Sequence, residues 1–414
     1  MKKSNIIENP SGMKAVNAFI FAGSFSLGTM KAGFDLLKVL EISNDQLKQN
    51  AFYFKKNVED VPVILPNEWE NDQYLDALCK ENIDLMCCNC PCSSLSQINR
   101  NASVNGKNNI HFYRLFNIFK HVKPKVFIIE NAPTLIKLGY PILKDMVHKL
   151  NDLYKFTVIR DIAGNHEVSM MRQRTLVFGW LRDAFKHIPI IKQDQHSLMS
   201  VKDTLVGLEE NMIDDFKSPT LGKISNLYKY AIPGNALMTS LAKRYIEDND
   251  FANMLDSQLK DTSYIREVKR IVEKLKTKKN FWDKSPYKLL DDERFPSFTS
   301  VTEYIHPHQD RMLNLVEMGR IMNYPDWYSF EDKYHVCTIP VSQAMAQGVP
   351  ANFGKYAATQ ARLALEEKLD SIEDENAIMS FQHHSKHKMS SFSIDEIDNM
   401  HMLDIKEKSI MLKD

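Results

Sequence analysis

The stretch "VNAFIFAGSFSLGTMKAGF", Val16–Phe34, gives the first indication of the fold. Val16–Phe21 is almost entirely apolar and predicts a buried strand, because strands covered on both faces read as continuous apolar runs. The glycines and serines of "AGSFSLG" favour a tight turn that leads into a helix. A buried strand, a turn and a helix in this order are typical of an α/β protein with a parallel sheet.

The same alternation of strand and helix patterns continues over roughly the first 180 residues. Further strands are predicted at Leu36–Ser43, Asn82–Cys88, Lys125–Ala132, Phe156–Ala163 and Arg174–Trp180. We therefore predict an α/β fold, with a mostly parallel sheet and flanking helices. Such sheets bind ligands at the carboxyl ends of their strands. Polar residues gather at the predicted strand ends. They are Glu41, those of the loop around Cys92, Glu130 and Asn131.

Composition and length limit the class of protein. The chain has 414 residues, 43% of them hydrophobic and 26% charged, as in ordinary globular proteins of one or two domains. It contains neither an apolar run of the roughly 18 residues that span a bilayer nor the apolar core of a signal peptide. Six cysteines, four of them crowded together, do not resemble a secreted disulfide framework. A cytoplasmic protein without a membrane partner is expected. The net charge of zero argues neither for nor against a polyanionic partner.

The crowded cysteines lie in "DLMCCNCPCSSLS", Asp84–Ser96. A metal site usually needs cysteine pairs two residues apart and a second pair elsewhere, which this spacing does not offer, so no metal is expected. Packing of small buried sulfurs beneath a strand end suits Cys87 and Cys88. It suits Cys92 less well, because "PCSSLS" is turn-like and should be accessible. A catalytic nucleophile on a loop after a strand is the third interpretation.

This stretch resembles the Pro-Cys loop of the DNA cytosine-5 methyltransferases, with Pro91 and Cys92 in the family's places. Five further stretches resemble the family's other motifs, in the family's order. They are "AGSFSLGTMKAGF" followed by Glu41, "KPKVFIIENAP" with Glu130 and Asn131, "HEVSMMRQRTLVFGW" with Arg172 and Arg174, "IHPHQDRMLNLVEMGRIMNYPDW" with Arg311, Glu317 and Arg320, and "AQGVPANFGKYAA". The resemblance covers roughly residues 14–182 and 298–360, and six motifs in order make it specific.

The resemblance implies a Rossmann-like, S-adenosylmethionine-dependent methyltransferase fold with a smaller target-recognition domain. Residues 1–184 and 296–365 would form the catalytic domain, and 185–295, where the strand–helix alternation is lost, would form the recognition domain. Residues 366–414 are expected to be a polar, poorly ordered C-terminal extension. The implied partners are double-stranded DNA and the methyl donor, and the protein is expected to be a monomer.

The implied chemistry explains the residue types. C5 of cytosine attacks a methyl donor only after a thiolate has added to C6, and Cys92 would be that thiolate. Glu130 would hydrogen-bond N3 and the exocyclic amine and supply a proton, although alone it would be read as a solvated strand-end carboxylate. Arg172 and Arg174 would fix the extruded base and the catalytic loop; for Arg172 a surface phosphate contact or a salt bridge is the alternative.

The donor and the DNA would be bound by two further sets of residues. In the cofactor set, the Gly turn would let backbone approach the donor and Glu41 would accept hydrogen bonds from its ribose. The expected cofactor-binding residues are Phe19, Ala22, Gly23, Ser24, Phe25, Ser26, Glu41, Ile42, Pro91, Gln347 and Val349. The expected DNA or substrate contacts are Asn131, Ser94, Ser96, Lys276, Lys278 and Lys279. The last three lie in the Lys-rich stretch Glu273–Lys288, with Phe281, Trp282 and Tyr287, which suits phosphate contact and equally suits a solvated helix end.

Several positions depart from the family's pattern. Cys88–Cys90 replaces Gly-Gly-Pro, Phe21 replaces a leading glycine, Ser169–Met170 replaces Pro-Gln, and Gln347 replaces an asparagine. Drift in a divergent lineage is the simpler account. The alternative is a pocket that takes an altered donor or an unusual pyrimidine.

Two other functions compete with methylation of DNA. An RNA methyltransferase of the same fold usually carries a different signature in its recognition region. A non-catalytic DNA-binding homologue would have no need of Cys92, Glu130 and Arg174 together. For an active enzyme, protection of host DNA beside a restriction enzyme and shielding of a phage genome are both open settings. The His-rich "QHHSKHK", Gln382–Lys388, is expected to be solvated rather than to bind a metal.

Overall fold

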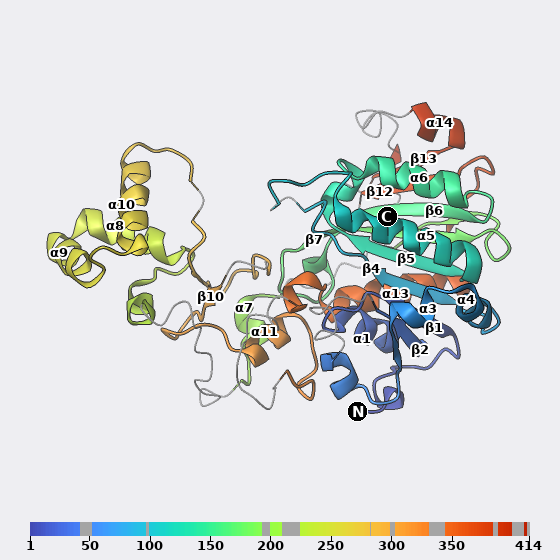
Figure 1. Ribbon diagram of the computed structural model, residues 1–414, viewed down its shortest axis with the longest axis horizontal. Coiled ribbons are helices and arrows are strands. Elements are labelled where there is room, and N and C mark those ends of the chain that lie inside the picture. The colour runs from blue at the N-terminus through green and yellow to red at the C-terminus, as the bar shows by residue number, and fades with distance from the viewer. Residues whose placement is uncertain are drawn as a thin grey trace. The chain divides into compact units, whose positions relative to one another are not determined.

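A computed structural model describes residues 1–41, 52–96, 99–192, 199–208, 224–281, 283–298, 303–330, 344–383, 388–399 and 410–411 (Figure 1). The chain divides into two compact units. The first unit comprises Met1–Leu198, Met322–Ser329 and Gln347–Asp414. The second comprises Met199–Ile321 and Phe330–Ala346. Each unit is described by itself below.

A large sheet forms the centre of the first unit (Figure 1). Within the described residues it has ten strands in the order β14-β13-β12-β6-β7-β5-β4-β1-β2-β3. The strands are β1 (Lys14–Ala18), β2 (Asp35–Leu40), β3 (Val63–Ile64), β4 (Leu85–Asn89), β5 (Val126–Asn131), β6 (Tyr154–Ile162), β7 (Gln173–Leu181), β12 (Met379–His383), β13 (Lys388–Phe392) and β14 (Ile410–Met411). The adjacent strands β3, β2, β1, β4 and β5, in this spatial order, pair in parallel. Strand β7 lies between β5 and β6 and is antiparallel to both.

The predicted α/β architecture is confirmed. Each of the six strands expected from the sequence is present, with ends shifted by a few residues. The reversed direction of β7 follows from its short connection to β6, because parallel neighbours need a crossover of a dozen or more residues. The connection Ala163–Arg172 contains only the short 3-10 helix η4 (Ala163–Asn165). As a result β7 begins at the edge of the sheet where β5 ends, with Asn131 opposite Thr175.

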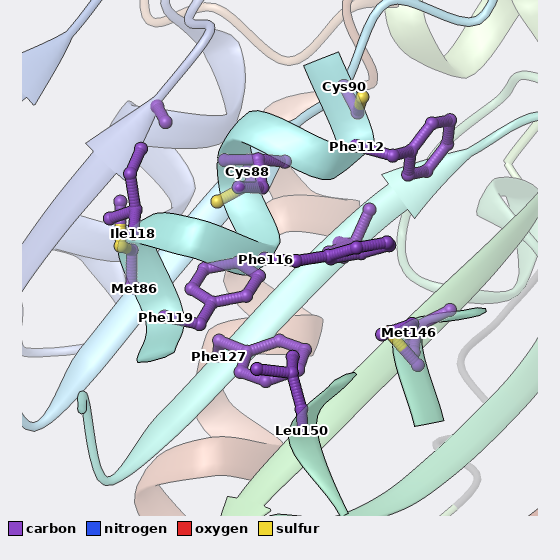
Figure 2. Packing of buried hydrophobic residues seen from close by; sticks show 14 of the residues in the cluster. Met86, Cys88, Cys90, Phe112, Phe116, Ile118, Phe119, Phe127, Met146 and Leu150 are labelled. Atoms are coloured by element: carbon purple, nitrogen blue, oxygen red, sulfur yellow. The ribbon is translucent and has the colours of Figure 1, made fainter. Parts of the chain in front are cut away.

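One face of the sheet is covered by α4 (Asp72–Cys79), α5 (Ile110–Val122) and α6 (Tyr140–Leu150), whose apolar residues join the main core. Alternate residues of β4 contribute to this core, since strand side chains point to opposite faces in turn. Figure 2 shows Met86, Cys88 and Cys90 beside phenylalanines of α5, with Phe127 of β5 below them. Phe119 and Phe127 stack with ring centroids 4.0 Å apart.

The opposite face carries α1 (Ser24–Lys31) and α13 (Ala351–Leu365), which lie far apart in the chain but pack against each other. Two glycines allow this close approach. A Cβ added at Gly28 would lie 2.4 Å from the carbonyl oxygen of Ala351 and 2.4 Å from the amide nitrogen of Lys355. A Cβ at Gly354 would lie 2.4 Å from the Phe25 ring. The helix pair therefore leaves no room for a methyl group at either position.

The smaller elements of the first unit connect these layers. They are η1 (Lys3–Asn5), α3 (Pro66–Trp69), η2 (Lys107–Asn109), η3 (Pro133–Ile136), the antiparallel pair β8 (Ile188–Pro189) and β11 (Ser371–Ile372), and α14 (Ile394–Asn399). Within the described residues no helix is both long and apolar enough to cross a membrane.

The expectation of a poorly ordered extension after residue 366 is wrong for its described part, because β12 and β13 continue the central sheet. Met379 and Phe392 belong to the main core. The intervening polar residues misled the prediction, since they too are buried. Ser380 lies within 3.3 Å of the Thr157 hydroxyl, and the Gln382 side chain accepts a hydrogen bond from the Ile191 amide. Of the His-rich stretch, residues 384–387 lie outside the described part of the chain.

The second unit is mainly helical. It contains α7 (Val201–Leu205), η5 (Ser225–Tyr230), α8 (Leu237–Glu247), α9 (Asn249–Gln258), α10 (Ser263–Lys276), the pair β9 (Tyr287–Lys288) and β10 (Tyr304–Ile305), and α11 (Leu315–Ile321). Helices α8, α9 and α10 bury their apolar faces in a core of their own. At the start of α11, Arg311 binds both carboxylate oxygens of the buried Glu317, at 2.9 and 2.7 Å. The predicted 185–295 region therefore corresponds largely to this unit, whose main segment extends to Ile321.

The packing of α1 on α13 predicts a graded effect of alanine at the two glycines. In an exposed helix Gly→Ala would stabilise by up to about 1 kcal/mol. Here we expect Gly28→Ala to lower the free energy of unfolding by about 1–3 kcal/mol, because the methyl group meets backbone that cannot move aside. Gly354→Ala should cost less, since the Phe25 ring can shift. Urea unfolding of both variants checks this; stabilisation by Gly28→Ala would contradict the close packing.

Candidate active site

Polar residues from several strands meet at one edge of the sheet. The strands β1, β2, β4 and β5 are parallel neighbours, so their carboxyl ends lie together. The residues at these ends are the loop after β1, Glu41 after β2, the Cys92 loop after β4, and Glu130 in β5. The predicted gathering of polar residues at this edge is therefore present in the structure.

The four crowded cysteines differ in environment. Cys87, Cys88 and Cys90 are buried, and Cys88 and Cys90 pack in the main core (Figure 2). Burial raises the pKa of Cys87 to about 12 and raises the pKa of Cys88 and Cys90 well above the ordinary value. Cys92 is partly exposed in the turn that follows β4. Packing thus accounts for the first three, and Cys92 is the accessible thiol of the cluster.

Asn131 holds the Cys92 loop against the end of β5. Its side-chain amide donates a 3.0 Å hydrogen bond to the carbonyl of Cys90, and its side-chain oxygen accepts from the amide of Ala132 at 2.9 Å. The Thr134 hydroxyl donates to the carbonyl of Leu95 further along the loop. Asn131 is completely buried, so the expected contact with DNA does not fit its position. Its place in the structure is that of a loop anchor.

Glu130 is a buried carboxyl paired with an arginine. Its side chain is 3% exposed, and its Oε1 lies 2.6 Å from Nε of Arg174. Burial raises the pKa of Glu130, while Arg174 and Arg172 oppose this increase. The alternative of a solvated strand-end carboxylate is wrong, because the Glu130 side chain is buried. A carboxyl of raised pKa retains a proton to higher pH and is suited to act as a general acid.

Arg172 and Arg174 come from the start of β7 and the loop before it. Arg172 is 3% exposed, which does not fit the alternative of a surface phosphate contact. Both guanidinium groups act electrostatically on Glu130. Arg174 also donates from Nη1 to the backbone carbonyl of Gln173, at 2.8 Å. The structure therefore brings Glu130, Arg172 and Arg174 together.

The loop between β6 and β7 is held by a buried pair that the sequence analysis missed. His166 Nε2 lies 2.8 Å from Oδ2 of Asp161, and both side chains are almost completely buried. The His166 ring stacks on Tyr356 of α13, with centroids 3.7 Å apart. Within the same loop, the amide of Ala163 donates to the carbonyl of Arg172. These contacts tie the backbone that carries Arg172 to α13.

The loop after β1 has an unusual backbone. Phe19 and Phe21 have φ angles of 61° and 48°, and Gly23 has a φ of 89°. Left-handed conformations cost an ordinary residue roughly 1–2 kcal/mol, which explains why glycine is preferred there. Phe21, which stands where the resembling family has a glycine, therefore has a backbone conformation that glycine favours. A Cβ at Gly23 would lie 2.5 Å from the Phe54 ring, so this position also requires glycine for space.

Glu41 lies directly after β2 and faces this loop. Its side chain is completely buried, and Oε2 accepts a 3.0 Å hydrogen bond from the amide of Ile20. Trp69 donates from its indole nitrogen to the backbone carbonyl of Glu41 at 2.9 Å. The carboxylate is thus fixed beside the glycine turn, as expected. Ile42, expected beside it, lies outside the described residues.

The other expected cofactor residues differ in their burial and in their hydrogen bonds. The carbonyl of Ala22 accepts from the hydroxyl of Tyr328 at 2.7 Å. Ser26 is turned inward, where its hydroxyl accepts from the side chain of Asn17 in β1. Ser24 and Phe25 begin α1, while Val349 precedes α13; all three are buried. Pro91 and Gln347 are partly exposed.

The expected DNA contacts are divided between buried and exposed positions. Ser94 is 6% exposed, and its hydroxyl accepts a hydrogen bond from the amide of Asn108, so its position does not fit direct DNA contact. Ser96 is partly exposed at the end of the Cys92 loop. Lys276, Lys278 and Lys279 are exposed at the end of α10 in the second unit, and Lys276 lies 3.7 Å from Glu273. Trp282 lies outside the described residues.

Two further residues at this edge escaped sequence analysis. They are Asn17 and Tyr328, besides the pair Asp161 and His166. A polar residue inside an apolar strand pattern was the available signal for Asn17. Tyr328 gave no signal, because its contact with Ala22 joins segments far apart in the sequence. Within the described residues no group of three His, Cys, Asp or Glu side chains is arranged to hold a metal ion.

Comparison with known proteins identifies the family of the chain. The family model for the C-5 cytosine-specific DNA methylases matches residues 13–362. Type II methyltransferase M.XorII of Xanthomonas oryzae is 23% identical over 352 residues, which cover 77% of this chain and 78% of that protein. Type II methyltransferase M.Sau96I of Staphylococcus aureus is 23% identical over 369 residues, covering 85% and 76%.

Solved structures share the fold. A candidate DNA modification methyltransferase encoded within an E. coli prophage superposes with a TM-score of 0.58 at 17% identity, covering 86% of this chain and 99% of that one. The Dnmt2 methyltransferase of S. pombe gives 0.51 at 12% identity, covering 86% and 98%. The chain belongs to the C-5 cytosine-specific DNA methylase family. The family resemblance seen in the motifs is thereby confirmed.

The different environments of the cysteines predict their reactivity. Burial raises the pKa of Cys87 from 9.0 to about 12, which lowers its thiolate fraction about a thousandfold near neutral pH. We expect brief iodoacetamide treatment at pH 7.5 to label Cys92 while Cys87, Cys88 and Cys90 stay unmodified. Peptide mass spectrometry locates the label, and Cys92→Ser serves as the control. Labelling of Cys88 ahead of Cys92 would contradict the described loop.

The raised pKa of Glu130 predicts a pH-dependent cost to stability. Above the ordinary pKa of a glutamate, near 4.3, the unfolded chain ionises before the folded one does. The free energy of unfolding of the natural chain should therefore fall, relative to that of Glu130→Gln, as the pH rises from about 4 towards neutrality. Each unit of pKa shift corresponds to about 1.4 kcal/mol. Urea unfolding across this pH range measures the difference, and a constant difference would contradict the raised pKa.

Proposed function

We propose that this chain is a DNA cytosine-5 methyltransferase that acts on a cytosine extruded from the duplex, through a transient bond between Cys92 and C6. One observation carries the proposal: the accessible Cys92 lies in a loop that Asn131 fastens to the end of β5, next to the buried Glu130 of raised pKa. A nucleophile and a general acid are thus presented at one edge of the sheet.

Each residue has a defined task in this mechanism. Cys92 adds as the thiolate to C6, which moves electron density towards C5 and N3. Protonated Glu130 donates its proton to N3, so that the ring becomes a neutral enamine. Arg174, 2.6 Å from Glu130, stabilises the carboxylate that this transfer leaves behind. After C5 has accepted the methyl group, it loses its proton to water and the bond between Cys92 and C6 breaks, which releases the thiolate. N3 then returns its proton to the Glu130 carboxylate, and the neutral aromatic ring is restored.

The residues at the other strand ends suit S-adenosylmethionine. When bound, this cofactor supplies an electrophilic methyl group. Glu41 is a buried carboxylate placed beside the turn after β1, where it would accept hydrogen bonds from ribose hydroxyls. The turn has no side chain at Gly23, and Tyr328 fixes its backbone through Ala22. These residues would hold and orient the donor.

The second unit is proposed to recognise the DNA target. It has its own core, and Lys278 and Lys279 are exposed beyond the end of α10. Exposed lysines contribute to affinity for phosphate and little to sequence preference. The base itself must leave the stack to reach a buried carboxyl such as Glu130. The similarity to type II methyltransferases supports a place beside a restriction enzyme.

A second candidate function, transfer of an altered group or modification of an unusual pyrimidine, is favoured by one observation. Asn89 and Ser169, both at positions that depart from the family's pattern, are buried with side-chain polar atoms that have no hydrogen-bond partner among the described residues. A buried polar group lowers the stability of the folded chain unless a hydrogen-bond partner pairs with it.

The proposal predicts that Cys92→Ser abolishes covalent trapping. The natural chain should form a denaturation-resistant adduct with DNA containing 5-fluorocytosine, because fluorine at C5 blocks the elimination that releases the thiolate. We expect Cys92→Ser to form no adduct and to lose at least about a thousandfold in turnover, as loss of a nucleophile usually causes. Cys79→Ser is the matched control, because Cys79 is a partly exposed cysteine at the end of α4. This variant should behave as the natural chain.

Mass spectrometry of nucleosides from the treated DNA identifies the product. Sole formation of 5-methylcytosine supports the methyltransferase and rejects the altered chemistry, whereas a different C5 substituent supports the second candidate. A Cys92→Ser variant that modifies DNA as fast as the natural chain would overturn the mechanism. Binding of DNA without any adduct or product would indicate a non-catalytic homologue.

A further inference from the structure

Asn89, the last residue of β4, is buried without a partner. Its side chain is 2% exposed. Neither Nδ2 nor Oδ1 has a hydrogen-bond partner within the described part of the chain. An unpaired buried amide has lost its hydrogen bonds to water without replacement, so the position is unfavourable for folding by itself. Such a residue requires a reason other than stability.

The surroundings of Asn89 show where its amide lies. In the sheet it stands directly opposite Glu130. Because strand side chains alternate, Asn89 shares a face with Cys87, and Cys87 interacts with Thr29 of α1. Met86 and Cys88 point the other way, into the core beside α5 (Figure 2). Asn89 therefore lies on the α1 side of the sheet edge, between the loop after β1 and the Glu130 carboxyl.

Other buried asparagines of the same unit are used by the fold. The Asn17 amide donates to Ser26 and Thr29, at 3.0 and 3.1 Å. Both polar atoms of Asn131 are paired. Asn109 donates to the carbonyls of Ser103 and Val104. Asn89 differs because neither of its polar atoms is paired within the described residues, whereas Asn17 and Asn109 leave only Oδ1 unpaired. It also stands within the Cys88–Cys90 stretch where the resembling family has Gly-Gly-Pro. The backbone at this position therefore does not require a side-chain amide.

We propose that Asn89 is a specificity-determining contact whose amide hydrogen-bonds the molecule bound beside Glu130. The inference rests on the proposed function. A neutral amide recognises a ligand that presents an acceptor next to a donor. Two groups have this chemistry: the hydrogen-bonding edge of the extruded pyrimidine, and the amino-acid end of the methyl donor. Asn89 stands opposite Glu130, which would bind the base, and on the face of the sheet that carries α1, whose preceding loop would bind the donor. Its amide pairs only when the ligand is bound.

Replacement of the amide tests the inference through two opposite effects. Asn89→Leu removes both polar atoms and keeps a branched side chain of similar shape. Because no protein hydrogen bond is lost, the thermal unfolding midpoint of the free protein should hold or rise. Binding of the ligand should weaken about tenfold, the loss expected for one or two hydrogen bonds. Asn109→Leu is the matched control, since it loses two hydrogen bonds and should lower the midpoint without this change in binding.

Two measurements distinguish the source of the contact. Calorimetric titration with S-adenosylmethionine in the absence of DNA reports on the donor. The rate of trapping on 5-fluorocytosine DNA at saturating donor reports on the base. A tenfold loss in the first measurement assigns Asn89 to the donor, and a loss in the second alone assigns it to the pyrimidine. Asn89→Gly, which restores the family's residue, removes the amide without adding bulk and should show the same loss.

Unchanged donor affinity and unchanged trapping in both variants, together with a lowered unfolding midpoint, would overturn the inference. The amide would then be satisfied within the folded protein, by an ordered water. This result differs from failure of the proposed function, in which the natural chain itself would form no adduct. The natural chain is therefore assayed for trapping beside each variant.

Discussion

Burial of the Glu130 carboxyl at the end of β5 is the constraint on which the site depends. A charge so placed is unfavourable unless it is paired, and here burial raises the pKa although Arg174 lies 2.6 Å away and Arg172 also acts on it. The pairing is a consequence of topology. Because β7 runs antiparallel to β5, its first residues return to the edge where β5 ends, and Arg174 is among them. A parallel β7 would begin at the opposite edge.

The neighbouring residue, Asn131, completes the arrangement from the same strand. It is buried, and its side-chain amide donates a hydrogen bond to the carbonyl of Cys90. The loop that contains Cys92 is therefore attached to the strand that carries Glu130. Adjacent residues of a strand point to opposite sides, which is why one strand end can hold a loop and supply a carboxyl at once. The thiol of Cys92 is partly exposed because it lies in the turn after β4, whereas Cys87, Cys88 and Cys90 are buried.

Segments remote in sequence provide the remaining supports. Helix α13 packs on α1 through Gly28 and Gly354, and Tyr356 of α13 stacks on His166 in the loop that carries Arg172. The helix that follows β1, the loop between β6 and β7, and α13 are thereby linked in one unit. The positions that depart from the family's pattern also lie in the first unit. Phe21, where the family has a glycine, adopts a left-handed backbone conformation of the kind that glycine favours.

The sequence alone predicted the order of strands and helices over roughly the first 180 residues, and it indicated the family. It also gave Cys92, Glu130, Arg172, Arg174 and Glu41 as candidate site residues, because apolar periodicity and short motifs are local properties. The tertiary structure decided what depends on distant contacts. It reversed β7, added β12 and β13 to the sheet, and turned Asn131 and Ser94 inward. Polar residues such as Gln382 were read as solvated, since burial and hydrogen bonding to remote backbone leave no trace in a local pattern. For the same reason the unpaired amide of Asn89 became visible only in the folded chain.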